Sequence, residues 1–250
     1  MPRQRSRTEQ LIDAAVTIPS RRVGGYVDSL RADHPEADPE ELIEILSSRY
    51  LWAVSGSGGA VGAAAAFPVV GTTAALALTA GQVTTFLAAS SVLCLAVAEV
   101  HGIATDDASR RRALLLTTLL GERGPQLMEQ QLGLASATWA KVLLTRLPVA
   151  TVKTVNRTLR HRMAKVVVTK GSTVFIGRLL PFGIGAVVGF VGSRAMGTNL
   201  VAGLREAFGP PPATFPRAIG HSLAAARLEG DLFSHAGGLI ETRTEDRDAD

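Results

Sequence analysis

Residues 50–98 read YLWAVSGSGGAVGAAAAFPVVGTTAALALTAGQVTTFLAASSVLCLAVA and contain no Asp, Glu, Lys, Arg or His. A helix on the surface of a soluble domain needs a polar face, so a charge-free stretch longer than one helix must be buried in protein or in lipid. This stretch therefore decides the fold class, and it says more about the location of the chain than about its chemistry.

The composition supports one dominant apolar core in a chain of 250 residues. Hydrophobic residues make up 46% and favour membrane association, whereas aromatic residues, at 5%, are too scarce for a typical multi-span protein. The single cysteine, Cys94, lies in the charge-free stretch and is expected to be a small buried apolar residue. It cannot form a disulfide framework, which fits a cytosolic environment. Glu9 and Asp13 follow the basic start, so no cleavable signal peptide is predicted.

The charges are unevenly distributed along the chain. The net charge is +4, and acidic residues cluster at 33–44 and 241–250, but none occurs between Gln130 and Arg205. That interval contains only basic charges, at Lys141, Arg146, Lys153, Arg157, Arg160, Arg162, Lys165, Lys170, Arg178 and Arg194, up to Arg205. A block of one sign suggests an anionic partner.

The periodicity of apolar residues predicts an all-α protein, because strand-like runs are few and short. We expect a helical bundle, membrane-associated, with two Gly/Ala-rich hairpin segments at 56–98 and 179–204, whose uncharged runs are 56–98 and 179–193. The expected helices span 8–31 (weak at Pro19 and Gly24-Gly25), 38–51 (with Asp38 as N-cap), 72–100, about 107–120 (started by Asp106 and Asp107), 125–147 and 149–168. Three segments are predicted: an N-terminal basic and amphipathic segment (1–34), a helical domain (35–208), and a Pro-rich linker with a short helix and an acidic tail (209–250).

Motifs for enzymatic chemistry are missing from the sequence. GSGGAVG at 56–62 is not a dinucleotide-binding turn, because Val61 replaces the third glycine and no acidic residue follows about twenty positions on. The five histidines are scattered without metal-ligand spacing. Cys94 would need a basic neighbour from elsewhere in the fold to act as a catalytic thiol. We therefore expect no enzyme, no cofactor and no metal site.

Two pairs of glycines are spaced four residues apart, Gly58 with Gly62 and Gly185 with Gly189. Small residues at this spacing allow helix backbones to approach closely in a membrane or in a dry protein core. These glycines are predicted to pack helices together.

The basic block is open to three interpretations. Nucleic acid is disfavoured, because residues 140–174 include no Phe, Tyr or Trp for stacking on bases. A solvated helix face would normally mix charges of both signs. The third interpretation is an interfacial helix at 149–168, in which Lys153, Arg157, Arg160 and Lys165 bind anionic lipid of the cytoplasmic leaflet. We favour the third and keep the solvated face as its alternative.

The expected depth of membrane insertion is shallow. Residues 72–98 are long enough to cross a bilayer core of about 30 Å, but they contain many Thr and Ser residues and Gln82. Residues 179–193 would reach only about 22 Å as a helix before Arg194. Two marginal segments predict a shallow or re-entrant hairpin, or a buried core.

The order of features resembles the EcsC-like family of bacterial proteins. The likeness covers roughly 35–208 and lies in DPEELIEIL before GAVGAAAAFPVVG, the long apolar helix that ends AVAEVHGI, the Asp-capped helix that ends LLTTLLGERG, and RLLPFGIGAVVGFVGSRAMGTNL. The resemblance implies an α-helical, membrane-associated bacterial protein whose activity is poorly defined, and it implies no catalytic residues.

The leading functional hypothesis is a non-enzymatic protein at the cytoplasmic side of the cell membrane, accessory or regulatory to transport or secretion machinery. Its predicted partners are anionic lipid and a membrane protein complex. The alternative is a soluble helical bundle that binds a lipid-like ligand or inserts conditionally, as pore-forming proteins do. An enzyme of unrecognised chemistry is the third and least favoured hypothesis.

Overall fold

The computed structural model of the chain describes residues 7–64, 72–103, 107–121, 123–132, 139–160, 162 and 184–216. All regular structure within these residues is helical, which confirms the predicted all-α class. The helices are α1 (Arg7–Ala15), α2 (Ser20–Asp33), α3 (Pro39–Ala64), α4 (Thr72–Val100), α5 (Ala108–Leu119), α6 (Arg123–Leu132), α7 (Trp139–Thr145) and α9 (Ile184–Phe208). Residues 149–160 are also helical and are named the basic helix below. The predicted short helix and acidic tail lie beyond residue 216, outside the described residues.

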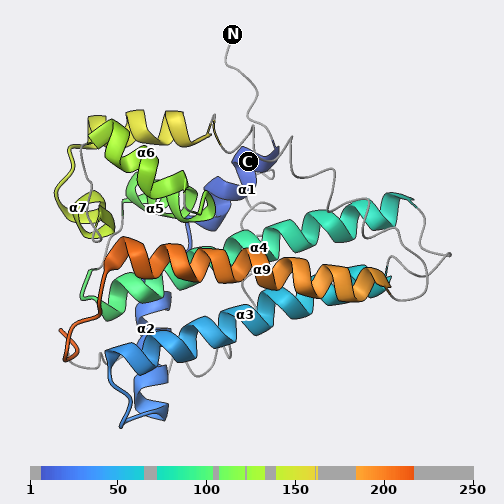
Figure 1. Ribbon diagram of the computed structural model, residues 1–250, viewed down its shortest axis with the longest axis horizontal. Coiled ribbons are helices and arrows are strands. Elements are labelled where there is room, and N and C mark those ends of the chain that lie inside the picture. Colours follow the sequence, from blue (N-terminus) through green and yellow to red (C-terminus); the bar gives the residue numbers. More distant parts are fainter. Residues whose placement is uncertain are drawn as a thin grey trace, which may run out of the picture.

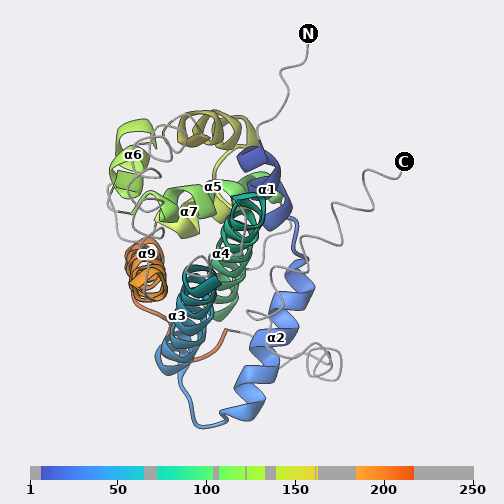
Figure 2. The same cartoon turned by 90° about the vertical axis from the view of Figure 1, so that its right-hand side faces the viewer.

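Three long helices, α3, α4 and α9, lie side by side and form the centre of the molecule (Figures 1 and 2). α4 has 29 residues and is therefore about 43 Å long. α3 and α9 run in opposite directions, because Gly58 contacts Gly189 whereas Tyr50, earlier in α3, lies near Gly197, later in α9. The remaining helices surround only part of this bundle.

The N-terminal part of the chain forms two helices, α1 and α2, in place of the single helix predicted at 8–31. The break lies at 16–19, where Pro19 is extended (φ −63°, ψ 131°) and cannot supply a backbone N–H to continue α1. Gly24 and Gly25, the other predicted weak point, are inside the continuous helix α2. Both helices pack on α4 and contribute side chains to the common core.

α3 begins as predicted and ends later than predicted. Asp38 Oδ1 accepts hydrogen bonds from the backbone N–H groups of Glu40 and Glu41, both at 2.9 Å. In return, the backbone N–H of Asp38 donates to Glu41 Oε2 at 3.1 Å. The helix does not stop at Leu51 but continues through its glycines to Ala64. Packing along α9 offsets the low helix propensity of these glycines, which costs about 1 kcal/mol each.

α4 spans Thr72–Val100, as predicted, and ends at a glycine. Gly102 adopts φ 74°, and the backbone N–H of Ile103 donates to Ala98 O at 2.8 Å. From Leu87 to Ala98 every side chain of this helix is buried. The second half of α4 is therefore the centre of the protein core.

The helices after α4 confirm one prediction and correct another. Asp107 caps α5 as expected, accepting hydrogen bonds from the backbone N–H groups of Ser109 and Arg110. The single helix predicted at 125–147 is wrong: the structure has two helices, α6 and α7, in its place. α6 starts two residues before Pro125.

α9 is one continuous helix, so the hairpin predicted at 179–204 is wrong for its described residues. Glycines within it are packed and do not form turns: Gly189 lies on Gly58, and Gly197 lies against Leu51 and Val54. Arg194 is in the middle of the helix and exposed. Only 179–183 of the predicted hairpin lie outside the described residues.

The ends of the three central helices project together to one side. We name residues 52–64 of α3, 72–86 of α4 and 184–193 of α9 the charge-free tip, because they contain no ionisable side chain of Asp, Glu, Lys, Arg or His. It forms the right-hand end of the molecule in Figure 1 and faces the viewer in Figure 2. α2, α5, α6, α7 and the basic helix lie toward the other end, which we name the charged end.

Candidate functional site

The outer surface of the charge-free tip is apolar. Trp52 and Val187 are each 63% exposed and Val191 is 57% exposed. The large hydrophobic side chains that are exposed in the described residues are Trp52, Leu78, Val83, Val149, Val187, Val191 and Met196. All of them except Val149 lie in the tip or, for Met196, within one turn of it.

Apart from Val54, the buried side chains of the tip are polar or small. Gln82 of α4 is buried and its Nε2 donates to Ser193 Oγ of α9 at 3.0 Å. Ser55 and Thr84 are buried as well, and their hydroxyl groups bond to backbone carbonyls of their own helices. The tip thus carries its hydrophobic groups outside and its polar groups inside, the reverse of a water-soluble domain.

The backbones of α3 and α9 touch in the tip at Gly58 and Gly189. A Cβ atom on Gly58 would lie 2.5 Å from Gly189 O and 2.8 Å from Ser193 Cβ, closer than van der Waals contact. Of the other two predicted packing glycines, Gly62 is buried on α3, and Gly185 lies in the first turn of α9. The contact between Gly58 and Gly189 is of the kind that small residues permit between helices.

Aromatic and basic side chains mark the base of the tip. The ring of Trp52 packs edge-on against Phe190 with centroids 6.1 Å apart and an angle of 62°. One helical turn after Phe190, Arg194 is exposed on α9. Below this level, Tyr50 Oη and Ser90 Oγ share a buried hydrogen bond of 3.0 Å, and burial raises the pKa of Tyr50. Trp52, the first residue of the tip in α3, and Arg194, the residue just after the tip in α9, therefore mark its base.

The basic helix is amphipathic and docks on the charged end. Val152, Val155 and Leu159 are buried, while Lys153 and Arg157 are exposed. The other two predicted lipid-binding residues differ: Arg160 is half-buried and its Nε donates to Asn156 O at 3.4 Å, and Lys165 lies outside the described residues. The apolar face formed by Val152, Val155 and Leu159 is packed against protein, so Lys153 and Arg157 are the main groups that this helix offers to an anionic partner.

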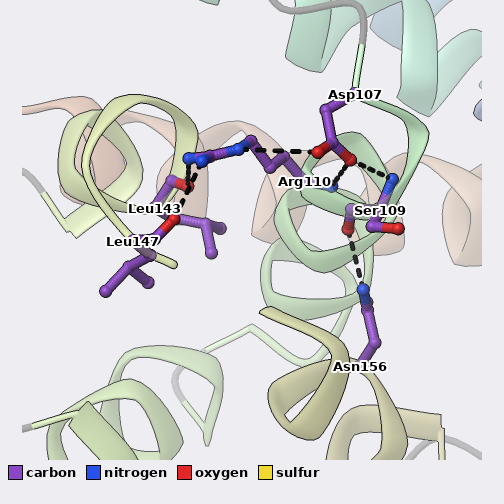
Figure 3. A network of polar contacts seen from close by, with 6 residues as sticks. All are labelled: Asp107, Ser109, Arg110, Leu143, Leu147 and Asn156. Carbon is purple, nitrogen blue, oxygen red and sulfur yellow. Dashed lines mark hydrogen bonds and ion pairs between the residues drawn. The ribbon is translucent and has the colours of Figure 1, made fainter. Parts of the chain in front are cut away.

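A polar network fixes the basic helix and α7 to the start of α5 (Figure 3). Arg110 donates to the carbonyl oxygens of Leu143 at 2.9 Å and Leu147 at 2.8 Å, and it lies 3.7 Å from the carboxylate of Asp107. Asn156 Nδ2 donates to Ser109 O at 2.8 Å. The contacts of Arg110 satisfy one carbonyl in the last turn of α7 and one just beyond its end, so Asp107 and Arg110 have a structural role.

The basic helix and the charge-free tip lie at different ends of the molecule. In Figure 1 the basic helix runs along the top left, above α5, while the tip is at the right. In Figure 2 the tip faces the viewer and the basic helix is one of the fainter, more distant parts. A membrane that receives the tip end-on would therefore lie away from Lys153 and Arg157.

The two side chains best suited to acid, base or nucleophilic chemistry are Cys94, which is buried, and His101, which is half-buried seven residues later. Cys94 Sγ lies 3.6 Å from Thr118 Oγ1, and burial raises its pKa to about 12. His101 Nδ1 lies 2.8 Å from Val97 O, its ring stacks on Phe208, and burial lowers its pKa. The described residues contain no cluster of His, Cys, Asp and Glu that could hold a metal ion.

The sequence did not reveal the residues that distinguish the tip. Trp52, Val187, Val191 and Met196 were not singled out, because a charge-free stretch does not show which of its side chains face outward. The spacing of Val187 and Val191, one helical turn apart, was the available signal. Two stretches, Ala80–Val100 and Ala186–Phe208, are long and apolar enough to cross a bilayer.

Comparisons with known proteins found no matching family model, no matching curated protein and no matching solved structure. The resemblance to EcsC-like proteins therefore rests on the sequence patterns quoted above and has no further support.

Proposed function

We propose that this protein associates with a membrane by placing the charge-free tip in lipid. The observation that carries the proposal is the reversed polarity of the tip, with Trp52, Val187 and Val191 outside and Gln82 and Ser193 hydrogen-bonded inside. In lipid, apolar side chains face outward, and polar side chains pair with one another between helices.

The energy of insertion favours lipid over water. Burying one large apolar side chain completely is worth about 1.5 to 3 kcal/mol. Six of them are partly exposed in or next to the tip, so transfer into lipid gains on the order of 5 kcal/mol. No charged side chain of the tip opposes this gain.

The alternative, a soluble bundle around a lipid-like ligand, receives less support. An open hollow of about 590 Å³ lies beside the start of α3, but carboxylates such as Asp33 and Glu41 line it, so it does not suit a lipid-like ligand. A partly enclosed cavity at the charged end, lined by residues that include His101, Phe208 and Leu204, has a volume of about 30 Å³. This is the size of one or two water molecules, whereas sites for small-molecule ligands usually enclose about 300 to 1,000 Å³. Conditional insertion is also unnecessary, because the hydrophobic side chains of the tip are already exposed.

The role of the basic helix stays a separate prediction. Lys153 and Arg157 would attract an anionic surface by charge alone, at about 1 kcal/mol per residue and with strong dependence on salt. The cytoplasmic side of the membrane, an accessory role in transport or secretion, and the absence of enzymatic activity likewise stay predictions.

Flotation with phospholipid vesicles tests the proposed function. The wild-type protein should float with the vesicles, and Val187→Gln combined with Val191→Gln should reduce the bound fraction at least tenfold. The matched control is Val149→Gln, because Val149 is 48% exposed at the charged end; it should bind like the wild type. Circular dichroism confirms that the variants are folded.

Two results would contradict the proposal. One is equal binding by the tip variant and the control. The other is a stable dimer in the absence of lipid that the tip substitutions dissociate, since the apolar surface would then be covered by a second copy of the chain.

A further inference from the structure

We infer that the tip enters one leaflet only, with Trp52 and Arg194 at the level of the lipid head groups. This inference rests on the proposed function and specifies how the same surface meets phospholipid. It is carried by the length of the tip, the position of charged residues in the two long apolar helices, and the residues at the base of the tip.

The length of the tip matches half of a bilayer. From Arg194 to Ile184, at the start of α9, the helix rises about 15 Å. From Trp52 to Ala64, at the end of α3, it rises about 18 Å. The hydrocarbon core of a whole bilayer is about 30 Å thick, so one leaflet accounts for about 15 Å of it.

α9 does not fit a complete crossing. In its apolar stretch Ala186–Phe208, Arg194 lies about 12 Å from the first residue and would be near the bilayer midplane. Arg205 and Glu206 are in the same stretch and exposed. A central arginine on a spanning helix costs about 2.5 to 3.5 kcal/mol, whereas at the head groups the same side chain is favourable.

α4 does not fit a complete crossing either. Most of its apolar stretch Ala80–Val100 is buried in protein, and the part from Leu87 onward packs under α1, α2 and α5. These covering helices carry charges, including the ion pair of Arg112 with Asp13 at 2.6 Å. The second half of α4 could contact lipid only if these helices moved away. Its hydrophobic side chains therefore form part of the protein core.

The base of the tip has the chemistry of a lipid head-group contact. Arg194 is exposed and forms no ion pair with another of the described residues. A guanidinium group offers a planar set of donors that matches a phosphate. Trp52, edge-on against Phe190, has an indole of the kind that concentrates where hydrocarbon meets water. The partner is therefore the phosphate of a phospholipid, preferably an anionic one.

Fluorescence quenching by nitroxide lipids measures the depth directly. The chain has two tryptophans, Trp52 and Trp139, and Trp139 is only 1% exposed at the charged end, so the Trp52→Phe variant supplies the unquenched background. In vesicles the wild type should be quenched most by a nitroxide at the head group. Trp52→Phe with Val187→Trp, about 10 Å deeper, should be quenched most by a nitroxide near the end of the acyl chain. Iodide trapped inside the vesicles should quench neither.

The role of Arg194 has its own pair of variants. Arg194→Gln should lower the affinity for vesicles with anionic lipid about fivefold, and Arg194→Lys should keep most of it. Arg146→Gln, an exposed arginine at the charged end, is the matched control and should bind unchanged. Equal losses for Arg194→Gln and Arg146→Gln would remove the assignment of Arg194.

The outcomes separate this inference from the proposed function. If the wild type does not float with vesicles, the proposed function is wrong. If it floats but Val187→Trp is quenched by the trapped iodide, or mainly by the head-group nitroxide, the protein binds the membrane and the one-leaflet depth is wrong.

Discussion

Individual residues in the tip show why its helices can pack without a conventional apolar core. Gly58 and Gly189 bring the α3 and α9 backbones into contact, and a hydrogen bond pairs the buried Gln82 Nε2 with Ser193 Oγ. Backbone contact and paired polar groups take the place of interdigitated large side chains. The large side chains are thereby left for the outer surface.

Two glycines in α3 provide an internally controlled test of this packing. Gly58→Ala should destabilise the protein by about 1 to 3 kcal/mol, because the new methyl group would overlap Gly189 and force the helices apart. Gly56→Ala, half a turn away with nothing within 4 Å of its added Cβ, should stabilise by up to about 1 kcal/mol through helix propensity. Urea unfolding followed by circular dichroism measures both. Equal effects for the two variants would show that Gly58 is not at a tight contact.

The elements differ in how far the sequence predicts them. α4 is predicted to the residue, since its start after Gly71 and its end at His101-Gly102 are local signals. α3 was expected to end at Leu51, because its glycines predict a break that contact with α9 prevents. α9 was expected to be part of a hairpin for a different reason: the apolar run 179–193 is too short to cross a bilayer before Arg194. Local sequence shows what a residue prefers, and only the packing partner shows what it tolerates.

The candidate site was likewise predicted only as far as local sequence allows. The absence of charge from residues 50–98 predicts burial in protein or in lipid, but it does not separate the buried half of α4 from its exposed start. That separation depends on packing with other helices, including α1, α2 and α5, which leaves every side chain from Leu87 to Ala98 buried. For the basic helix, the sequence shows the cations directly. It does not show that the apolar face of this helix is buried in the protein core and is therefore not available to lipid.

The network at the start of α5 tests how the elements of the charged end are joined. Arg110→Met keeps the apolar stem of the side chain but removes the hydrogen bonds to Leu143 O and Leu147 O. We expect a loss of about 2 kcal/mol or more in the free energy of unfolding. Arg146→Met, at an exposed position in the same region, should change it by less than about 0.5 kcal/mol. Chemical unfolding of both variants measures the two changes. If Arg110→Met lowered the free energy of unfolding as little as Arg146→Met, α7 would not depend on this contact.

At the scale of the whole molecule, the protein has two ends of different character. The charged end contains the core and a basic surface, and the other end is a three-helix projection without charge, one leaflet long. This arrangement predicts end-on attachment to a membrane. The basic helix then faces away from the attached leaflet, where an anionic partner would have to be sought separately.

Photolabelling from within the bilayer tests the end-on attachment most directly. A lipid with a carbene-generating group on its acyl chain should form adducts in 52–64, 72–86 and 184–193, detected by peptide mass spectrometry, and none in the basic helix at 149–160. Adducts at 149–160, or an unlabelled tip in vesicles that bind the protein, would contradict the account.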